Sequence, residues 1–163
     1  MSAALRFVHL LSLAVWIGAV VFFSFVTAPA LFGALPREMA GRATAAIFPR
    51  YYVLGATCGG AALVSGALLA LRSPGAVRWL LPEVLIVAVM TGLTLYAGWG
   101  ILPEADRLRR ALHAPPGGIE NGAMRARFSD LHRRSVALNG AVLLLGLSAL
   151  ALTALDHRAG PGP

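Results

Sequence analysis

The sequence predicts an all-α protein, a four-helix transmembrane bundle with short amphipathic helices in its cytoplasmic loops. Charged residues make up 13% of the 163 residues and hydrophobic residues 58%, and the mean hydropathy is +0.73. A water-soluble domain carries about 25% charged residues. Four apolar stretches also each reach the roughly 20 residues that a helix needs to cross a bilayer core of about 30 Å. They are residues 7–35, 51–71, 79–103 and 135–155.

We expect spans at about 7–30, 51–71, 79–102 and 135–155, in a single integral membrane domain over residues 1–158, with a disordered tail over 159–163. The first apolar run is longer than the core of a secretory signal peptide, so we interpret it as a retained helix. No period-like internal repeat is visible, although the first and second helix pairs could be related by pseudo-symmetry.

The connection between the first two spans contains two prolines with different predicted roles. Pro36 stands near the first position of a short helix, where proline is favoured. Pro49 is expected to interrupt that helix. The next residues, Arg50, Tyr51 and Tyr52, are of the types that gather at the membrane–water interface, and we interpret them as interfacial anchors.

The connection between the third and fourth spans should contain two helical stretches. Glu104 and Asp106 follow Pro103 closely, and acidic residues are favoured in the first turn of a helix. The run Pro115-Pro116-Gly117-Gly118 predicts a break. A second helix should begin at about residue 119 and continue into the fourth span.

Arginine supplies the positive charge, and its distribution predicts the orientation. Ten of the fourteen arginines lie in the two long connections and four lie on the opposite side. The positive-inside rule therefore places both long connections in the cytoplasm and both termini outside. The net charge of +7 is interpreted as orienting the helices and meeting anionic lipid headgroups, and nucleic acid is not an expected partner.

Two ionisable side chains, His9 and Glu83, lie inside the spans, where such groups are costly and are often functional. His9 shares a helix face with Ser12, Trp16 and Phe23. His9 and Glu83 should lie at similar depth near the outer face. They could share a proton, ligate a metal together, or form a hydrogen bond without further function. Each could also simply reach water at the interface.

A second polar face is predicted on the fourth span, where His132, Ser135 and Asn139 follow helical spacing. Asn139 lies about two turns inside the bilayer, where an amide needs a partner. Tyr96 of the third span should lie at comparable depth and could meet Asn139 or Ser135. Interhelical hydrogen bonding and ligand contact remain alternative roles for these positions.

Sequence signatures of soluble enzymes are absent. There is no phosphate-binding loop, dinucleotide fingerprint, HExxH or CxxC, so we do not expect an enzyme. The single cysteine, Cys58, lies inside the second span and allows no internal disulfide. The four methionines are scattered and do not form a copper path.

Several segments together resemble a bacterial membrane family. They are His9-Leu-Leu-Ser-Leu-Ala-Val-Trp16-Ile-Gly18, Phe22-Phe23, Ala28-Pro29-Ala30-Leu31-Phe32, Leu35-Pro36-Arg37, Gly41-Arg42, Phe48-Pro49-Arg50-Tyr51 and Leu131-His132-Arg133-Arg134-Ser135-Val136-Ala137-Leu138-Asn139. The joint pattern is similar to the family catalogued as domain of unknown function 4149, which includes proteins similar to transmembrane protein 205. This resemblance implies a four-helix membrane protein and says little about activity.

A more distant likeness is to the copper-resistance D family and to the haem-binding protoporphyrinogen oxidase family. Both carry an early His followed by Trp and Gly, as His9, Trp16 and Gly18 do here. The likeness implies that His9 would ligate a metal or haem, with Glu83 as second ligand or proton acceptor and Trp16 as a wall. Haem and copper are the cofactors it suggests.

Three functions remain open at this point. The first is a small membrane protein that handles a metal or haem through His9. The second is a non-catalytic accessory subunit of a larger membrane complex, for which the small-residue face of Gly55 and Gly59 and the Arg-rich loop could supply contacts. The third is a small-solute transporter or exporter that works as an oligomer. The lipid bilayer is the expected environment in all three, and a homo-oligomer or a larger complex is the expected assembly.

Overall fold

The computed structural model describes residues 2–72, 77–112 and 121–156, which are helical except for a turn at Leu35 and Pro36. The elements are α1 (Ser2–Phe22), the π-helical turn η1 (Phe23–Thr27), α2 (Ala28–Ala34), α3 (Arg37–Arg72), α4 (Val77–Leu95), the π-helical turn η3 (Tyr96–Ile101), α5 (Leu102–Leu112) and α6 (Asn121–Asp156). The predicted fold class is confirmed.

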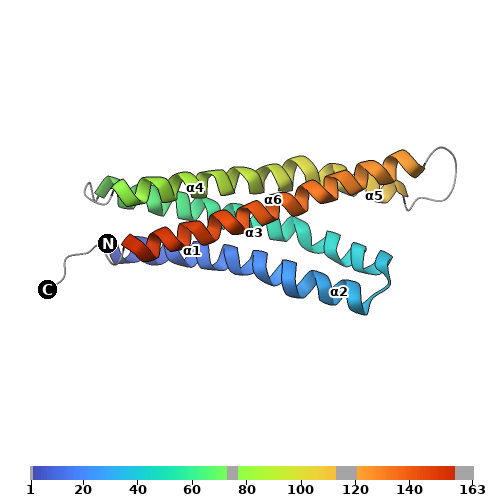
Figure 1. The fold of residues 1–163 in the computed structure, drawn as a ribbon, viewed down its shortest axis with the longest axis horizontal. Coiled ribbons are helices and arrows are strands. Elements are labelled where there is room, and N and C mark those ends of the chain that lie inside the picture. The colour runs from blue at the N-terminus through green and yellow to red at the C-terminus, as the bar shows by residue number, and fades with distance from the viewer. Residues whose placement is uncertain (1, 73–76, 113–120, 157–163) are drawn as a thin grey trace.

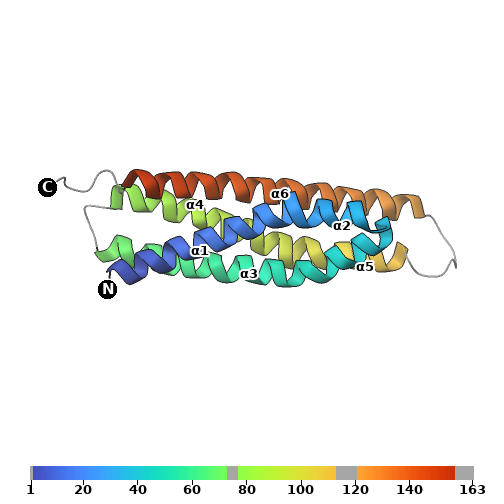
Figure 2. The same ribbon diagram turned by 90° about the horizontal axis from the view of Figure 1, so that it is seen from below.

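The helices form an elongated bundle of four rods (Figures 1 and 2). The rods are Ala3–Ala34, Arg37–Arg72, Leu80–Leu112 and Gly122–Ala154, each long and apolar enough to cross a membrane. One end of the bundle holds the start of α1, the end of α3, the start of α4 and the end of α6, and we call it the terminal end. The opposite end holds α2, the start of α3, α5 and the start of α6, and we call it the loop end.

Neighbouring rods run in opposite directions. Helix α1 packs against α3, α3 against α4 and α4 against α6, and a smaller contact between α1 and α6 closes the ring. Helices α1 and α4 therefore run parallel and stand diagonally across the ring. This placement brings side chains near their first turns to the same depth.

The first and third rods each contain a π-helical turn just ahead of a proline. Pro29 follows η1 and Pro103 follows η3. A proline has no N–H to donate to the carbonyl four residues earlier. In both rods the wider turn closes with a hydrogen bond five residues back, from Ala28 N–H to the Phe23 carbonyl and from Leu102 N–H to the Ala97 carbonyl.

The two halves of the chain therefore repeat the same order of elements. Each half has a helix, a π-turn, a short proline-bearing helix and then a helix of 36 residues. His9 precedes the first π-turn by about as many residues as Glu83 precedes the second. The pseudo-symmetry that the sequence left open is present in the architecture, and it places His9 and Glu83 at corresponding positions.

The expected interruption at Pro49 was wrong. Helix α3 passes through Pro49 without a break, so the short helix of the first connection and the second span are one helix. An internal proline costs a hydrogen bond, and membrane helices tolerate that loss when neighbouring helices compensate. Here the ring centroids of Phe48 and Phe23 are 5.1 Å apart, and Phe48 stacks on Tyr52 with ring centroids 5.8 Å apart. These contacts hold the helix on both sides of the proline.

The helices expected between the third and fourth spans are both present as extensions of the spans. Helix α5 continues from η3, and α6 starts at Asn121 and runs into the fourth span. The carboxylate of Glu104 in α5 pairs with the Arg127 guanidinium of α6 at 2.9 Å. The predicted break at 115–118 and the predicted tail at 159–163 lie outside the described residues.

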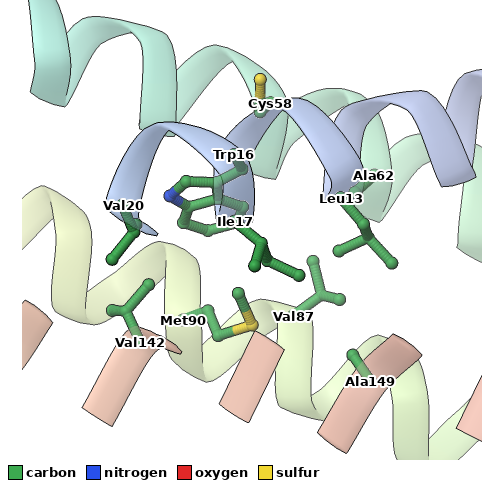
Figure 3. Packing of buried hydrophobic residues seen from close by; sticks show 10 residues of the cluster. All are labelled: Leu13, Trp16, Ile17, Val20, Cys58, Ala62, Val87, Met90, Val142 and Ala149. Atoms are coloured by element: carbon green, nitrogen blue, oxygen red, sulfur yellow. The ribbon is translucent and has the colours of Figure 1, made fainter. Parts of the chain in front are cut away.

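An apolar core occupies the middle of the bundle and draws on all four rods (Figure 3). It consists of Leu13, Trp16, Ile17, Val20, Cys58, Ala62, Val87, Met90, Val142 and Ala149. The small residues of α3 admit the largest of these side chains. A Cβ atom at Gly55 or Gly59 would lie 3.0 or 3.1 Å from the Trp16 indole. The Gly55–Gly59 face is therefore packed inside the bundle.

Candidate functional site

A buried ionisable pair lies near the terminal end of the bundle. His9 projects from α1 and Glu83 from α4, and the distance from His9 Nε2 to Glu83 Oε1 is 2.9 Å. His9 is 3% exposed and Glu83 is 2% exposed. The sequence-based expectation that these two residues lie at the same depth and can meet agrees with this geometry.

The second nitrogen of His9 fixes which tautomer is present. His9 Nδ1 lies 2.9 Å from the Ala62 carbonyl of α3. A carbonyl oxygen can only accept, so Nδ1 carries a hydrogen and donates it. The Ser65 hydroxyl lies 3.3 Å from the same nitrogen and donates to the Ala61 carbonyl at 2.6 Å, so its oxygen is also placed to accept from Nδ1. Nε2 is left as the nitrogen that faces Glu83 Oε1.

The carboxylate of Glu83 has a second partner from the remaining rod. The Thr153 hydroxyl of α6 donates a hydrogen bond to Glu83 Oε1, the same oxygen that faces His9. Thr153 also lies 3.0 Å from the Ala149 carbonyl in its own helix. Each of the four rods thus contributes one group or more to the cluster of His9, Ala62, Ser65, Glu83 and Thr153, which we call the His–Glu cluster.

Close packing holds the imidazole ring against α3. A Cβ atom built on Gly66 would lie 3.1 Å from His9 Cε1 and 2.9 Å from Val84 Cγ2. Only glycine leaves room at this position for the ring and the neighbouring valine together. The His9 ring is consequently confined between α3 and the Glu83 carboxylate.

The electrostatics of the cluster favour a single shared proton. An isolated charge in an apolar interior is expensive, whereas a hydrogen-bonded pair of opposite charges or a neutral pair is tolerated. With Nδ1 protonated, the pair is neutral overall whether the last proton resides on Nε2 or on Oε1. Within the described ranges, no group of three or more His, Cys, Asp and Glu side chains comes together that could hold a metal ion.

A second polar set lies nearer the loop end. The Tyr51 hydroxyl of α3 donates to Asn139 Oδ1 of α6 at 3.3 Å, and the Tyr52 hydroxyl lies near the Ser135 side chain. The bond from Tyr51 gives the amide oxygen of Asn139 the partner that its position inside the bilayer requires. Along α3 and α6 the apolar core lies between this set and the His–Glu cluster.

The expected meeting of Tyr96 with Asn139 or Ser135 is corrected here. Tyr96 belongs to η3 and is 55% exposed, and Tyr51 bonds Asn139 instead. Tyr52 is 3% exposed and stacks on Phe48, while the Tyr51 ring packs with Phe23 and Phe48. The role of Tyr51 and Tyr52 as interfacial anchors stays a prediction.

The other predicted positions are distributed as follows. Ser12 is buried but donates to the Val8 carbonyl of its own helix at 2.7 Å. Trp16 belongs to the apolar core, two turns from His9. Arg50 is exposed and donates to the Ala46 carbonyl at 3.1 Å. His132 is exposed at the loop end.

Sequence reasoning missed Ser65, Thr153 and the Ala62 carbonyl. Counting helix residues from the terminal end places the Ser65 and Thr153 hydroxyls at about the depth of His9 and Glu83. This similar depth was the sequence signal that could have identified them.

The comparisons with known proteins bear on the family and not on the chemistry. The family described as a domain of unknown function (DUF4149) matches residues 11–114, which is more than half of the chain. The matched range contains Glu83, Ala62 and Ser65, while His9 and Thr153 lie outside it. No curated protein and no solved structure matches the chain.

Proposed function

This chain belongs to the DUF4149 family, and we propose that it is a small integral membrane protein that takes up and releases a proton at the His–Glu cluster. The observation that carries the proposal is the 2.9 Å contact between His9 Nε2 and Glu83 Oε1, in a setting where Nδ1 already donates to Ala62. Histidine and carboxylate pairs inside membranes are the usual components of proton relays.

The free-energy cost of burying the His9–Glu83 pair supports a role beyond packing. Replacing a buried ion pair by apolar residues of similar volume is often neutral or stabilising. Each rod places an apolar core residue, Leu13, Ala62, Val87 or Ala149, about one turn from His9, Ser65, Glu83 or Thr153. Leucine or methionine at positions 9 and 83 together would therefore serve the bundle about as well, and the ionisable pair is better explained by the proton it holds.

The depth of the cluster supports proton exchange with the terminal end. His9 lies seven residues after the start of α1, about 10 Å along the helix at 1.5 Å per residue. Toward the loop end the apolar core fills the bundle, with Leu13, Val87 and Met90 fully buried. This arrangement favours a proton site that exchanges protons with the medium at the terminal end. It does not favour a solute pathway through a single bundle, so we do not propose transport.

The positions of the arginines favour placing the terminal end outside the cytoplasm. Among the described residues, ten arginines belong to the loop end and three to the terminal end. We therefore assign the protein to a bacterial inner membrane with both termini outside, so that the proton would come from the outer side.

The residues present do not fit a resident haem or metal. His9 has one nitrogen committed to a carbonyl, the other held by Glu83, and a side chain packed too closely for a porphyrin face. A metal ion at Nε2 and Oε1 would have two such ligands, since the described residues gather no third one. Transition-metal sites in proteins take three or four.

The accessory-subunit hypothesis loses the contact surface that motivated it. The Gly55–Gly59 face is covered by Trp16 and by Thr91 within the bundle. A partner would have to bind elsewhere on the rods.

Difference infrared spectroscopy of the protein in bilayers tests the proposal. Changing the pH of the medium should alter a band from a protonated carboxylic acid, and Glu83→Gln should abolish that change. Thr153→Val should shift the band, because it removes the hydroxyl partner of Oε1. Ser148→Ala is the matched control, since Ser148 is an exposed hydroxyl of the same helix that bonds only the Leu144 carbonyl. A spectrum that Glu83→Gln leaves unchanged would overturn the proposal, as would a stoichiometric metal bound through His9.

A further inference from the structure

An open hollow at the loop end is separate from the His–Glu cluster. It has a volume of about 470 Å³ and is lined by Phe32 of α2, Arg37 at the start of α3 and His132 of α6. These residues are exposed and come from three different elements. Binding sites for small molecules commonly have about 300–1,000 Å³.

The guanidinium of Arg37 differs from most of its neighbours at this end. Five other arginines there are ion-paired, Arg42 with Glu38, Arg109 with Asp106, Arg127 with Glu104, and Arg133 and Arg134 with Asp130. Arg37 has no such acidic partner within the described part of the chain. Its guanidinium is therefore available to an anion that enters the hollow.

We propose that this hollow binds the phosphate group of an anionic phospholipid. Arginine binds phosphate oxygens through two parallel N–H bonds, and His132, which also lines the hollow, offers a further N–H donor. Phe32 adds an apolar surface, which suits the start of an acyl chain and not a free ion. The combination of cation, second donor and aromatic wall matches a lipid headgroup joined to its chains.

The location of the hollow favours lipid over a soluble phosphate. Helices of 36 residues, such as α3 and α6, extend about 54 Å. That exceeds the roughly 30 Å bilayer core, so their ends reach the headgroup layer. The ten arginines of the loop end attract anionic lipids to this layer. Phe25 and Val26 of η1, close to α2 along the same rod, are exposed and offer a path for acyl chains.

Native mass spectrometry of the full chain, released from nanodiscs, tests the proposal. Phosphatidylglycerol and phosphatidylcholine with identical chains are the two lipid probes, and inorganic phosphate is the soluble probe. We expect retained phosphatidylglycerol in preference to phosphatidylcholine. Arg37→Gln should weaken that retention about tenfold, as the loss of a charge-assisted hydrogen bond predicts. His132→Gln should weaken it less.

Arg42→Gln is the matched control, because Arg42 lies in the same helix but is paired with Glu38 and does not line the hollow. Equal losses in Arg37→Gln and Arg42→Gln would overturn the proposal by showing diffuse attraction to the basic end. Equal retention of the two lipids would also overturn it. Displacement of phosphatidylglycerol by millimolar inorganic phosphate would identify a free-phosphate site instead.

Discussion

At the residue scale, the free energy of the bundle depends on how His9 and Glu83 satisfy each other. Without the other, His9 would keep only its Nδ1 partners and Glu83 only the Thr153 hydroxyl, so His9 Nε2 and part of the Glu83 carboxylate would be buried without a partner. Removing one member of such a pair costs more than the pair itself contributes, because the remaining member stays desolvated.

Glu83→Ala should therefore lower the free energy of unfolding by about 3–5 kcal/mol. The double variant His9→Leu with Glu83→Leu should lose less than that, because neither polar group is left behind. Unfolding in mixed micelles measures both values. If the loss in the double variant equalled the sum of the losses in the single variants His9→Leu and Glu83→Leu, the two side chains would not be coupled.

The residue types also explain which parts of the cluster could be predicted from the sequence. His9 and Glu83 are conspicuous because ionisable groups are rare in apolar runs. Ser65 and Thr153 are not, because hydroxyls in membrane helices ordinarily bond the carbonyl four residues earlier. Ser65 donates to the Ala61 carbonyl in this way and also contacts His9. Thr153 lies within bonding distance of the Ala149 carbonyl, yet its hydroxyl also reaches Glu83. Only the tertiary arrangement reveals the second contact.

At the scale of single elements, glycines decide how closely α3 approaches its neighbours. A Cβ atom at Gly59 would lie 2.5 Å from Thr91 Oγ1 of α4 and 3.1 Å from Trp16 of α1. The next residue, Gly60, has no atom within 4 Å of such a Cβ. Consecutive glycines in one helix thus have opposite tolerance for a methyl group.

Gly59→Ala should destabilise the bundle by about 1–3 kcal/mol, the range for overpacking a filled interior. Gly60→Ala should leave stability unchanged or slightly raise it, since alanine loses less backbone entropy. Thermal unfolding in detergent compares the two. If Gly60→Ala destabilised the bundle more than Gly59→Ala, the assignment of Gly59 to the packed face of α3 would be contradicted.

The elements were foreseen from hydropathy to different degrees. The four spans followed from composition, because the backbone of an apolar run in lipid has to satisfy itself as a helix. The continuity of α3 through Pro49 did not follow, since it depends on aromatic contacts from Phe23 that are distant in sequence. The π-turns before Pro29 and Pro103 did not follow from hydropathy either, because they arise from hydrogen bonds that shift to the carbonyl five residues back.

At the scale of the whole molecule, the repeat of two halves sets the depth of the cluster. Helices α1 and α4 run in the same direction from the terminal end, so corresponding residues of the two halves share one level. The hydroxyl of Ser65 serves His9 and that of Thr153 serves Glu83, and each comes from the long helix of the same half. The cluster therefore lies where the two halves meet.

The proposed orientation can be tested with single cysteines in cells. Arg72→Cys introduces an exposed thiol at the terminal end, and Arg42→Cys introduces one at the loop end. A membrane-impermeant maleimide added outside should label position 72 and not position 42. The unmodified chain is the control, because Cys58 is 8% exposed and lies in the core. Labelling at position 42 alone would invert the topology.

Nitrogen NMR of the His9 ring in bilayers measures whether His9 and Glu83 share one proton in their buried site. We predict a protonated Nδ1 and an Nε2 signal that moves strongly in Glu83→Gln, because the amide can no longer exchange a proton with the ring. If the His9 ring instead titrated as a solvated histidine, with signals indifferent to residue 83, the account of the site would be contradicted.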